Sequence, residues 1–188
     1  MINNFDLISS LLNFDNSDLF YHLQILRRGK DHPDLPSANR VIKTYYIDNN
    51  EKLDKIKQEI IDLCEFFGAR AYINLAPKSY HKCTMQCIAD MAIRAEDKSS
   101  DPYWIIDVDG PTDGKISEFI EYECEPLRYC MEGPHKVYYN KIYDYIPTKN
   151  GYHIITSPFN LEQFKKKYPN IDVHKNNPTI LYIPKSLY

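Results

Sequence analysis

The stretch YWIIDVDG, residues 103–110, is an apolar run that ends in two aspartates, Asp107 and Asp109. Because consecutive positions are apolar, the stretch predicts a central strand that is buried on both faces. Side chains two residues apart point to the same face of a strand, so both carboxylates should project together. Like charges this close repel each other unless a cation lies between them, and Mg2+ or Mn2+ suits such oxygen ligands. The alternative is structural, because Asp-Gly is also typical of a turn.

A predicted hairpin follows the two aspartates. Its strands are expected over residues 138–146 and 152–157, joined by a turn that ends in Asn-Gly. His153 lies near the start of the second strand, Lys149 lies in the turn, and Gly151 lets a ligand or another backbone come close. His153 and Lys149 are therefore candidates for binding phosphate oxygens, whereas the structural alternative for His153 is a satisfied strand histidine.

A third acidic candidate lies near the end of the sequence, where Asp172 follows the apolar Ile171. A helix is expected over residues 161–167 and a strand over residues 179–183. Asp172 would bring a third carboxylate to the metal. The alternative is an ordinary loop aspartate.

Upstream of residue 103, the sequence predicts a β-α-β unit. Residues 40–47 are rich in β-branched and aromatic side chains, residues 51–67 show helical spacing of apolar positions, and residues 69–75 form the next strand. The two strands of such a unit should lie parallel in one sheet. Residues 19–26 fit a strand or the end of a helix, and a second helix is expected over residues 80–95.

The order of these elements is typical of an α+β domain whose sheets are covered by helices. A helix over residues 115–131, broken at Pro126, is expected between the aspartates and the hairpin. We expect one domain over residues 1–188, with three parts: an N-terminal segment (1–39), a β-α-β-α unit (40–98) and a unit that carries the acidic and histidine motifs (99–188).

The composition is that of an ordinary globular protein, with 43% hydrophobic and 26% charged residues. The net charge of −3 does not indicate nucleic-acid binding by itself, although it does not exclude a local basic surface. Arg27, Arg28 and Lys78 are the candidates for contacting a nucleic acid. Their alternative role is that of solvated surface charges.

A zinc site at Cys83, Cys87, Cys124 and Cys130 is the less favoured interpretation of the cysteines, because their spacings are not of the C-x2-C type. The alternative is that they are core residues. The sequence has five cysteines, an odd number: Cys64, Cys83, Cys87, Cys124 and Cys130. The first residues lack a secretory signal, and no apolar run reaches the length of a membrane span. We therefore expect a cytoplasmic protein with reduced thiols and no membrane partner.

Taken in this order, the motifs resemble those of the archaeo-eukaryotic primase superfamily. The core of that family carries a hydrophobic strand ending in D-x-D, a small-x-His motif on a later strand, and a hydrophobic-Asp motif. The matching residues here are Asp107 and Asp109, then Gly151-Tyr152-His153, then Ile171-Asp172. The resemblance implies that the three aspartates bind two catalytic divalent metals and that His153 contacts the phosphates of the incoming nucleotide. It also implies an RRM-like catalytic sheet combined with a second α/β unit.

The function expected from this resemblance is nucleotidyl transfer on a single-stranded DNA template, by a DNA primase or primase-polymerase. Nucleoside triphosphates are the expected substrates, and a helicase or another replication protein is a candidate partner. His153 and Asp172 are only 19 positions apart, closer than in the family pattern. This departure fits a reduced, non-priming or inactive member, such as one of phage or mobile-element origin. The alternatives are a metal-dependent nuclease with His153 as general base and a non-catalytic module that binds single strands.

Overall fold

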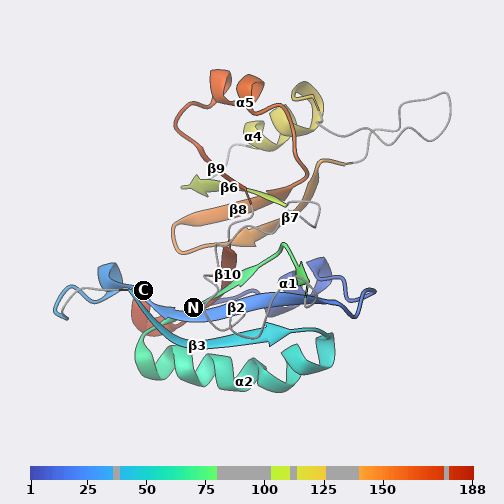
Figure 1. The fold of residues 1–188 in the computed structure, drawn as a ribbon. Helices are drawn as coiled ribbons and strands as arrows, with labels where there is room; N and C mark the ends of the chain where they lie inside the picture. The colour runs from blue at the N-terminus through green and yellow to red at the C-terminus, as the bar shows by residue number, and fades with distance from the viewer. Residues whose placement is uncertain (36–38, 80–102, 111–113, 126–139, 176–177) are drawn as a thin grey trace. The chain divides into compact units, whose positions relative to one another are not determined.

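The computed structural model describes residues 1–35, 39–79, 103–110, 114–125, 140–175 and 178–188. The chain divides into two compact units: Met1–Asp101 together with Asn176–Tyr188, and Pro102–Lys175 (Figure 1). Each unit contains an antiparallel sheet and at least one helix, so the predicted α+β class is confirmed. The helix expected over residues 80–95 lies outside the described residues.

The sheet of the first unit has the strand order β1-β10-β4-β2-β3, and β5 also pairs with β2. Strands β3 and β4 each lie antiparallel to β2 on opposite sides of it, so they are parallel to each other, as predicted, although not adjacent. The elements are β1 (Ile2–Asn3), α1 (Phe5–Leu11), β2 (Leu19–Arg27), a 3₁₀ turn (Gly29–Asp31), β3 (Arg40–Ile47), α2 (Asn50–Phe67), β4 (Arg70–Asn74), β5 (Lys78–Ser79), β10 (Pro178–Ile183) and a 3₁₀ turn (Lys185–Leu187).

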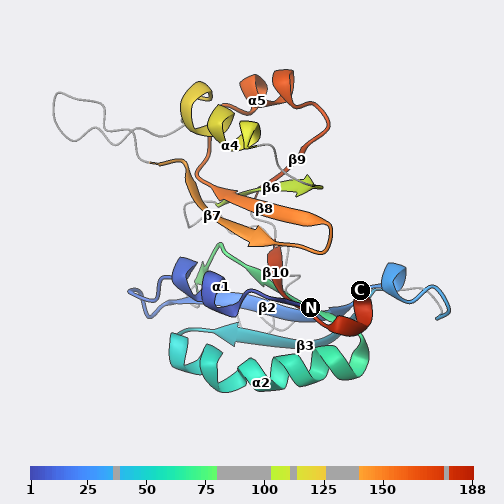
Figure 2. The same ribbon diagram turned by 180° about the vertical axis from the view of Figure 1, so that it is seen from behind.

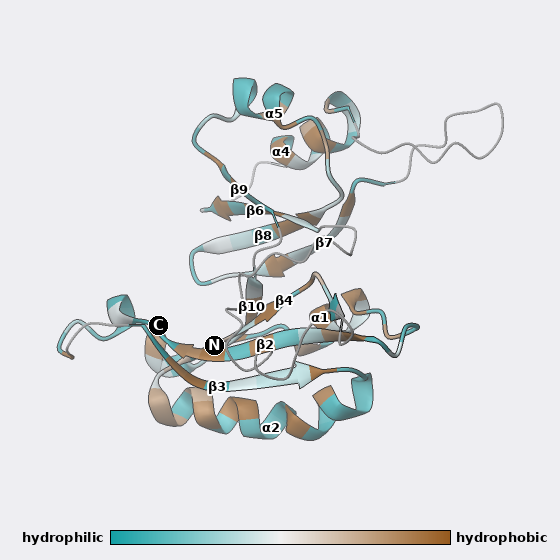
Figure 3. Cartoon of the chain, viewed as in Figure 1, coloured by the Kyte–Doolittle hydropathy of each residue, from teal (hydrophilic) through white to brown (hydrophobic). Residues whose placement is uncertain are grey.

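Helix α2 begins and ends where its sequence predicts. The Asn49 side chain caps the helix by accepting a hydrogen bond from the Lys52 amide at 2.7 Å. Gly68 ends it in the left-handed conformation, with φ 54°. The buried positions of the helix lie on one face: Leu53, Ile60 and Cys64. Figure 3 shows hydrophilic and hydrophobic segments alternating along α2, as expected of a helix that packs one face on a sheet.

The second unit follows the element order β-α-β-β-α-β, and its sheet has the strand order β7-β8-β6-β9 with every neighbouring pair antiparallel. Its elements are β6 (Trp104–Asp109), α4 (Lys115–Glu118), a π-helical turn (Phe119–Glu123), β7 (Ile142–Pro147), β8 (Gly151–Thr156), α5 (Leu161–Lys167) and β9 (Asp172–Lys175). Strand β6 is central, as its apolar sequence predicts. The two ends of the unit lie side by side, because Trp104 pairs with Lys175.

The core of the second unit lies between the sheet and its helices (Figure 2). Alternate residues of β6 point into this core, where they meet the side chains of α4, the π-helical turn and α5. The buried members are Trp104, Ile106, Val108, Ile116, Phe119, Ile120, Cys124, Ile154, Phe159 and Phe164. The helices therefore cover one face of this sheet, and β6 directs its remaining side chains to the opposite face.

The helix expected over residues 115–131 is present from Lys115 to Glu123, first as α4 and then as a π-helical turn, and it ends at Cys124, shortly before the break expected at Pro126. This end is anchored to the approach to β7. The Glu121 carboxylate accepts hydrogen bonds from the backbone amides of Lys141 and Ile142, each at 2.9 Å, and Lys141 Nζ donates to the Cys124 carbonyl at 2.6 Å. These long-range bonds join the end of the helical segment to the start of β7. Residues 126–139 lie outside the described part.

The final strand, β10, belongs to the first sheet, where it lies between β1 and β4. The second unit therefore ends at Lys175, earlier than the 99–188 span that the sequence predicts. Burial explains this placement, because Leu181 and Ile183 are fully buried in the first unit. A polar contact adds to it, since the Asn4 side chain donates to the Ile180 carbonyl at 3.0 Å.

Candidate functional site

Asp107 and Asp109 lie on the face of the second sheet that α4 and α5 leave uncovered. The alternation of β6 explains this, because Ile106 and Val108 point into the helix-covered core and the aspartates point the other way. The Asp107 side chain is 38% exposed and Asp109 is exposed. The two carboxylates therefore lie on the same face of β6, as predicted.

The strand register lines up Asp107 with two other candidate residues. Asp107 lies opposite His153 of β8 on one side and opposite Asp172 of β9 on the other. Residues directly opposite in an antiparallel pair share a face, with Cβ atoms about 5 Å apart. His153 Nε2 lies 3.5 Å from Asp107 Oδ1, and the His153 side chain is 13% exposed. Three motifs that are distant in the sequence thus form one row across three strands.

Gly151 lies opposite Asp109, at the point where the β7–β8 hairpin approaches β6. A Cβ atom at this position would lie 1.9 Å from the Val108 carbonyl oxygen, so glycine is required by the neighbouring backbone. Two hydrogen bonds fix the turn: the Thr148 amide donates to the Gly151 carbonyl at 2.9 Å, and the Gly110 amide donates to the Asn150 carbonyl at 2.8 Å. The sequence suggests that Gly151 allows the approach of either a ligand or another backbone. In the structure it is the backbone of β6 that comes close.

The remaining candidate of the hairpin, Lys149, is exposed in the turn between β7 and β8. It follows Thr148 and precedes Asn150, the residue whose carbonyl accepts from Gly110. Because Gly110 directly follows Asp109, the turn that carries Lys149 lies beside the end of the acidic strand. A phosphate role for Lys149 and His153 stays a prediction.

Sequence reasoning missed two polar residues on the same face. His174 of β9 lies opposite Ile105, two residues along from Asp172, and Asp144 of β7 lies opposite Ile155. For His174, the missed signal was the alternation in Asp-Val-His-Lys, a short strand that was not among the elements predicted from the sequence. Among the described residues, this face therefore carries four carboxylates and two imidazoles, together with the buried Ile105, Ile146 and Ile155.

The donor set of this face suits a hard divalent cation, since carboxylate oxygens are the ligands that Mg2+ and Mn2+ prefer. Within the described ranges, however, no three His, Cys, Asp or Glu side chains are placed to hold one ion together. Asp109 and Asp172 are both exposed. Joint coordination of an ion would thus require these two surface side chains to rotate toward Asp107, which little packing opposes.

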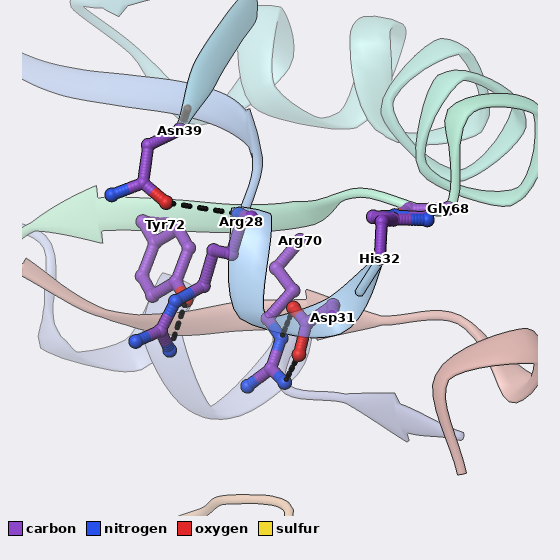
Figure 4. A network of polar contacts seen from close by, with 8 residues as sticks. Arg28, Asp31, His32, Asn39, Gly68, Arg70 and Tyr72 are labelled. Carbon is purple, nitrogen blue, oxygen red and sulfur yellow. Dashed lines mark hydrogen bonds and ion pairs between the residues drawn. The ribbon is translucent and has the colours of Figure 1, made fainter. Parts of the chain in front are cut away.

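The candidate nucleic-acid contacts lie in the first unit, and they differ in exposure. Arg27 lies opposite Arg40 at the end of the β2–β3 pair, which brings two cations together. Arg28 Nη1 donates to the Tyr72 hydroxyl at 3.2 Å (Figure 4). Lys78 is only 1% exposed. Of the three cations, Lys78 is therefore the one whose position does not support contact with a phosphate backbone.

The same end of the first sheet holds a buried ion pair. Arg70 Nε and Nη2 donate to the two Asp31 carboxylate oxygens at 2.7 and 2.5 Å, and both side chains are less than 10% exposed (Figure 4). His32 Nε2 lies 2.7 Å from the Gly68 carbonyl oxygen beside this pair. Because Asp31 neutralises the charge of Arg70, the arginines that contribute positive charge at this end are Arg27, Arg28 and Arg40.

The described cysteines have structural surroundings. Cys64 lies on the buried face of α2, where burial raises the pKa of its thiol to about 12. Cys124 is buried in the core of the second unit, and burial raises the pKa of its thiol to about 11. Both thiols are thus protonated at neutral pH. Cys83, Cys87 and Cys130 lie outside the described residues.

Comparison with known proteins does not indicate a function for this chain. No family model matches the chain, and neither a curated protein nor a solved structure matches it. In the part of the chain that the structure describes, no helix is both long and apolar enough to cross a membrane. The feature that remains is the row of His153, Asp107 and Asp172 with Asp109 beside it.

Proposed function

We propose that this protein is a metal-dependent nucleotidyltransferase that extends a strand on a single-stranded DNA template, in the manner of a primase or primase-polymerase. The observation that carries this proposal is the register of the second sheet, in which Asp107 lies between His153 and Asp172. Three short motifs, each ambiguous alone, meet on one face, and carboxylates with an imidazole are groups that phosphoryl chemistry uses, which supports the proposal.

The arrangement of the second unit supports the RRM-like part of the proposal. The β-α-β-β-α-β order and the strand order β7-β8-β6-β9 are those of a split β-α-β fold. In this fold the helices pack on one face. The opposite face carries the carboxylates, together with the buried side chains of Ile105, Ile146 and Ile155. The first unit then corresponds to the second α/β unit of the proposed architecture.

The metal of the proposed reaction is Mg2+ or Mn2+, with Asp107, Asp109 and Asp172 as its ligands. When bound, the metal lowers the pKa of an attacking 3′-hydroxyl and neutralises the pyrophosphate that leaves. The contribution of the chain is to concentrate carboxylates on one rigid sheet, since Asp107 is held by pairing on both sides. Without a bound cation, the neighbouring carboxylates repel one another.

The roles proposed for His153 and Lys149 follow from their positions beside the aspartates of the second sheet. His153 carries an imidazole that donates a hydrogen bond to a phosphate oxygen of the nucleoside triphosphate, and Asp107 at 3.5 Å orients the ring. Lys149, exposed in the adjacent turn, supplies a positive charge for the same triphosphate. Gly151 keeps that turn close to Asp109. In the first unit, Arg27 and Arg28 are the proposed contacts to the template backbone.

Incubation with a primed single-stranded template, nucleoside triphosphates and Mn2+ tests this proposal. Strand extension is expected, with a loss of at least about 100-fold in Asp107→Asn, Asp109→Asn or Asp172→Asn. Asp54→Asn is the matched control, because Asp54 is an exposed carboxylate on α2 in the other unit. Full extension by the Asp107→Asn and Asp109→Asn variants would contradict the assignment.

A metal-dependent nuclease is the second candidate, and the His153–Asp107 contact favours it, because a carboxylate beside an imidazole is typical of a general base. The same assay separates the two, since shortened products indicate a nuclease and lengthened products indicate a polymerase. A binding module that stacks bases on its sheet fits less well. The paired positions on this face around Asp107 hold isoleucine, carboxylate and imidazole side chains without a Phe, Tyr or Trp.

A further inference from the structure

Two arginines at the end of the β2–β3 pair lack a counter-charge. Arg27 and Arg40 lie directly opposite each other in the register, so their side chains share a face, with Cβ atoms about 5 Å apart. Like charges in this arrangement destabilise a sheet. Within the described residues neither guanidinium makes an ion pair or a side-chain hydrogen bond. The described part of the fold therefore gives no structural reason for this pair.

A carboxylate is supplied to a neighbouring cation but not to the arginine pair. Lys43, three residues after Arg40 on the same strand, forms an ion pair with Glu59 of α2. The loop between β2 and β3 has two carboxylates. Asp31 is taken up by its buried ion pair, and Asp34 is exposed without an ion pair to any described residue. The positive charge of the pair is therefore open to a ligand from outside the chain.

The loop between β2 and β3 is closed at its base, which keeps further donors beside the pair. The Asn39 side-chain oxygen accepts a hydrogen bond from the Gly29 amide at 3.1 Å, so the two ends of the loop stay together (Figure 4). Arg28 lies at this base and donates from Nη1 to the Tyr72 hydroxyl at 3.2 Å. Because a guanidinium has five N–H donors, Arg28 keeps most of its donors for a ligand. The exposed Lys30 adds a charge in the same loop.

We propose that Arg27 and Arg40 together clamp one backbone phosphate of a single-stranded nucleic acid and that they do so without a metal. The inference rests on the proposed function for its choice of partner, and it adds Arg40 and metal independence to the proposed template contacts. Two planar guanidinium groups offer paired N–H donors that match phosphate oxygens, and a phosphate between them removes their mutual repulsion. Contacts to the phosphate backbone position a strand without reading its sequence.

Fluorescence anisotropy of the full chain with a labelled single-stranded oligothymidylate, in the presence of EDTA, tests the clamp without any metal. Arg27→Gln and Arg40→Gln should each weaken binding by at least about fivefold. Each should also reduce the slope of log K against log salt concentration by about 0.7, the value for one phosphate contact of a single strand. Lys166→Gln is the matched control, because it removes one positive charge from an exposed ion pair on α5 and should change neither quantity. Wild-type affinity and salt slope in both arginine variants would overturn the inference.

Urea unfolding supplies a second readout that separates a ligand site from a structural role. In Arg40→Gln the midpoint of the free protein should rise, because one of two repelling charges is removed, although the same variant binds the oligonucleotide more weakly. Arg40→Lys keeps the charge but loses the planar fork, so it should keep the salt slope and still bind more weakly than the wild type. A lower urea midpoint in Arg40→Gln would assign Arg40 a structural role and refute the clamp.

Two further comparisons identify the partner and separate the inference from the proposed function. If polyglutamate displaces the labelled strand as well as unlabelled oligothymidylate does at equal charge concentration, the site accepts any acidic polymer and phosphate recognition is refuted. Strand extension by the wild type, with oligonucleotide binding unchanged in Arg27→Gln and Arg40→Gln, would remove the clamp and leave the proposed function standing. Binding that depends on both arginines, in a protein that extends no strand with Mg2+ or Mn2+, would do the reverse.

Discussion

A methyl group at Gly151 would collide with the Val108 carbonyl oxygen, because its Cβ atom would lie only 1.9 Å away. We expect Gly151→Ala to lower the free energy of unfolding by at least about 2 kcal/mol, since β8 must move away from β6. Urea unfolding measures this change. Gly110→Ala is the comparison, because Gly110 has a positive φ but open space around it, and it should cost about 1 kcal/mol from backbone strain alone. Equal effects of the two substitutions would show that the close approach is unimportant.

His22 makes stability depend on pH. Its ring is fully buried, its nitrogens have no hydrogen-bond partner within the described residues, and it stacks on Tyr46 with 5.6 Å between ring centres. Burial, and then the charge of Lys78, lower the pKa of His22 to about 4. In the unfolded chain that pKa is about 6.5, so between these values the unfolded state binds more protons. Stability is therefore complete above pH 6.5 and falls by up to about 3 kcal/mol as the pH drops to 4.

Replacing His22 tests this prediction. His22→Phe keeps an aromatic ring against Tyr46 but cannot titrate, so its unfolding free energy should change less between pH 7 and pH 4.5 than that of the wild type. Urea unfolding in the presence of EDTA measures both proteins. His174→Gln, which removes a half-buried histidine, is the control and should keep the pH dependence of the wild type. A His22→Phe variant with that same dependence would place the titrating group elsewhere.

Among the elements, the 3₁₀ turn after β2 is held to β4 by the buried pair of Asp31 and Arg70. Removing one partner leaves an unpaired buried charge, so Asp31→Asn should cost about 3–5 kcal/mol of unfolding free energy. Disruption of an exposed pair, by Lys166→Ala opposite Glu162, should cost far less, because solvent screens both charges. Thermal unfolding compares the two variants. The double substitution Asp31→Leu with Arg70→Met should recover most of the loss, because it leaves neither charge behind.

Elements with strong local patterns could be predicted from the sequence, whereas elements that depend on distant partners could not. The cap at Asn49 and the glycine at Gly68 define α2, and the turn before Gly151 defines the hairpin. Strand β9 escaped prediction because its Asp-Val-His-Lys sequence becomes a strand only by pairing with β6. Helix α1 escaped it because a helix of 7 residues depends on its contacts with the sheet and with α2.

The candidate site follows the same division. The shared face of Asp107 and Asp109 is a local consequence of strand alternation, so the sequence alone predicts it. The alignment of His153 and Asp172 with Asp107 depends on the register of two strand pairs, which no single segment encodes. The family resemblance supplied that grouping, and it omitted His174, which is visible only once β9 is paired.

At the scale of the whole molecule, the second unit interrupts the first, since residues 102–175 lie between parts of the chain that share one sheet. Its ends meet, because Trp104 pairs with Lys175. We expect a fragment of residues 103–175 to fold alone, since it contains its own core. A cooperative thermal transition and a dispersed amide spectrum would confirm this, and the spectrum of an unfolded chain would contradict it.

The complementary deletion is the control. Replacing residues 103–175 with a short Gly-Ser linker should leave the strand pairs of the first sheet intact, since none of them uses a residue of the second unit. Far-ultraviolet circular dichroism before and after deletion measures the helix that remains, chiefly α2.

The pairing of Trp104 with Lys175 also bears on how such a chain arises. The entry and exit strands of the module are neighbours, so its two ends lie about one strand spacing apart, roughly 5 Å, and the strand pairs of the host sheet use no residue of the module. Ancestral loss, gain or replacement of the acidic module would then leave the host sheet whole. Recombination at these two positions with a foreign module of the same strand order is a practical route to chimeric proteins.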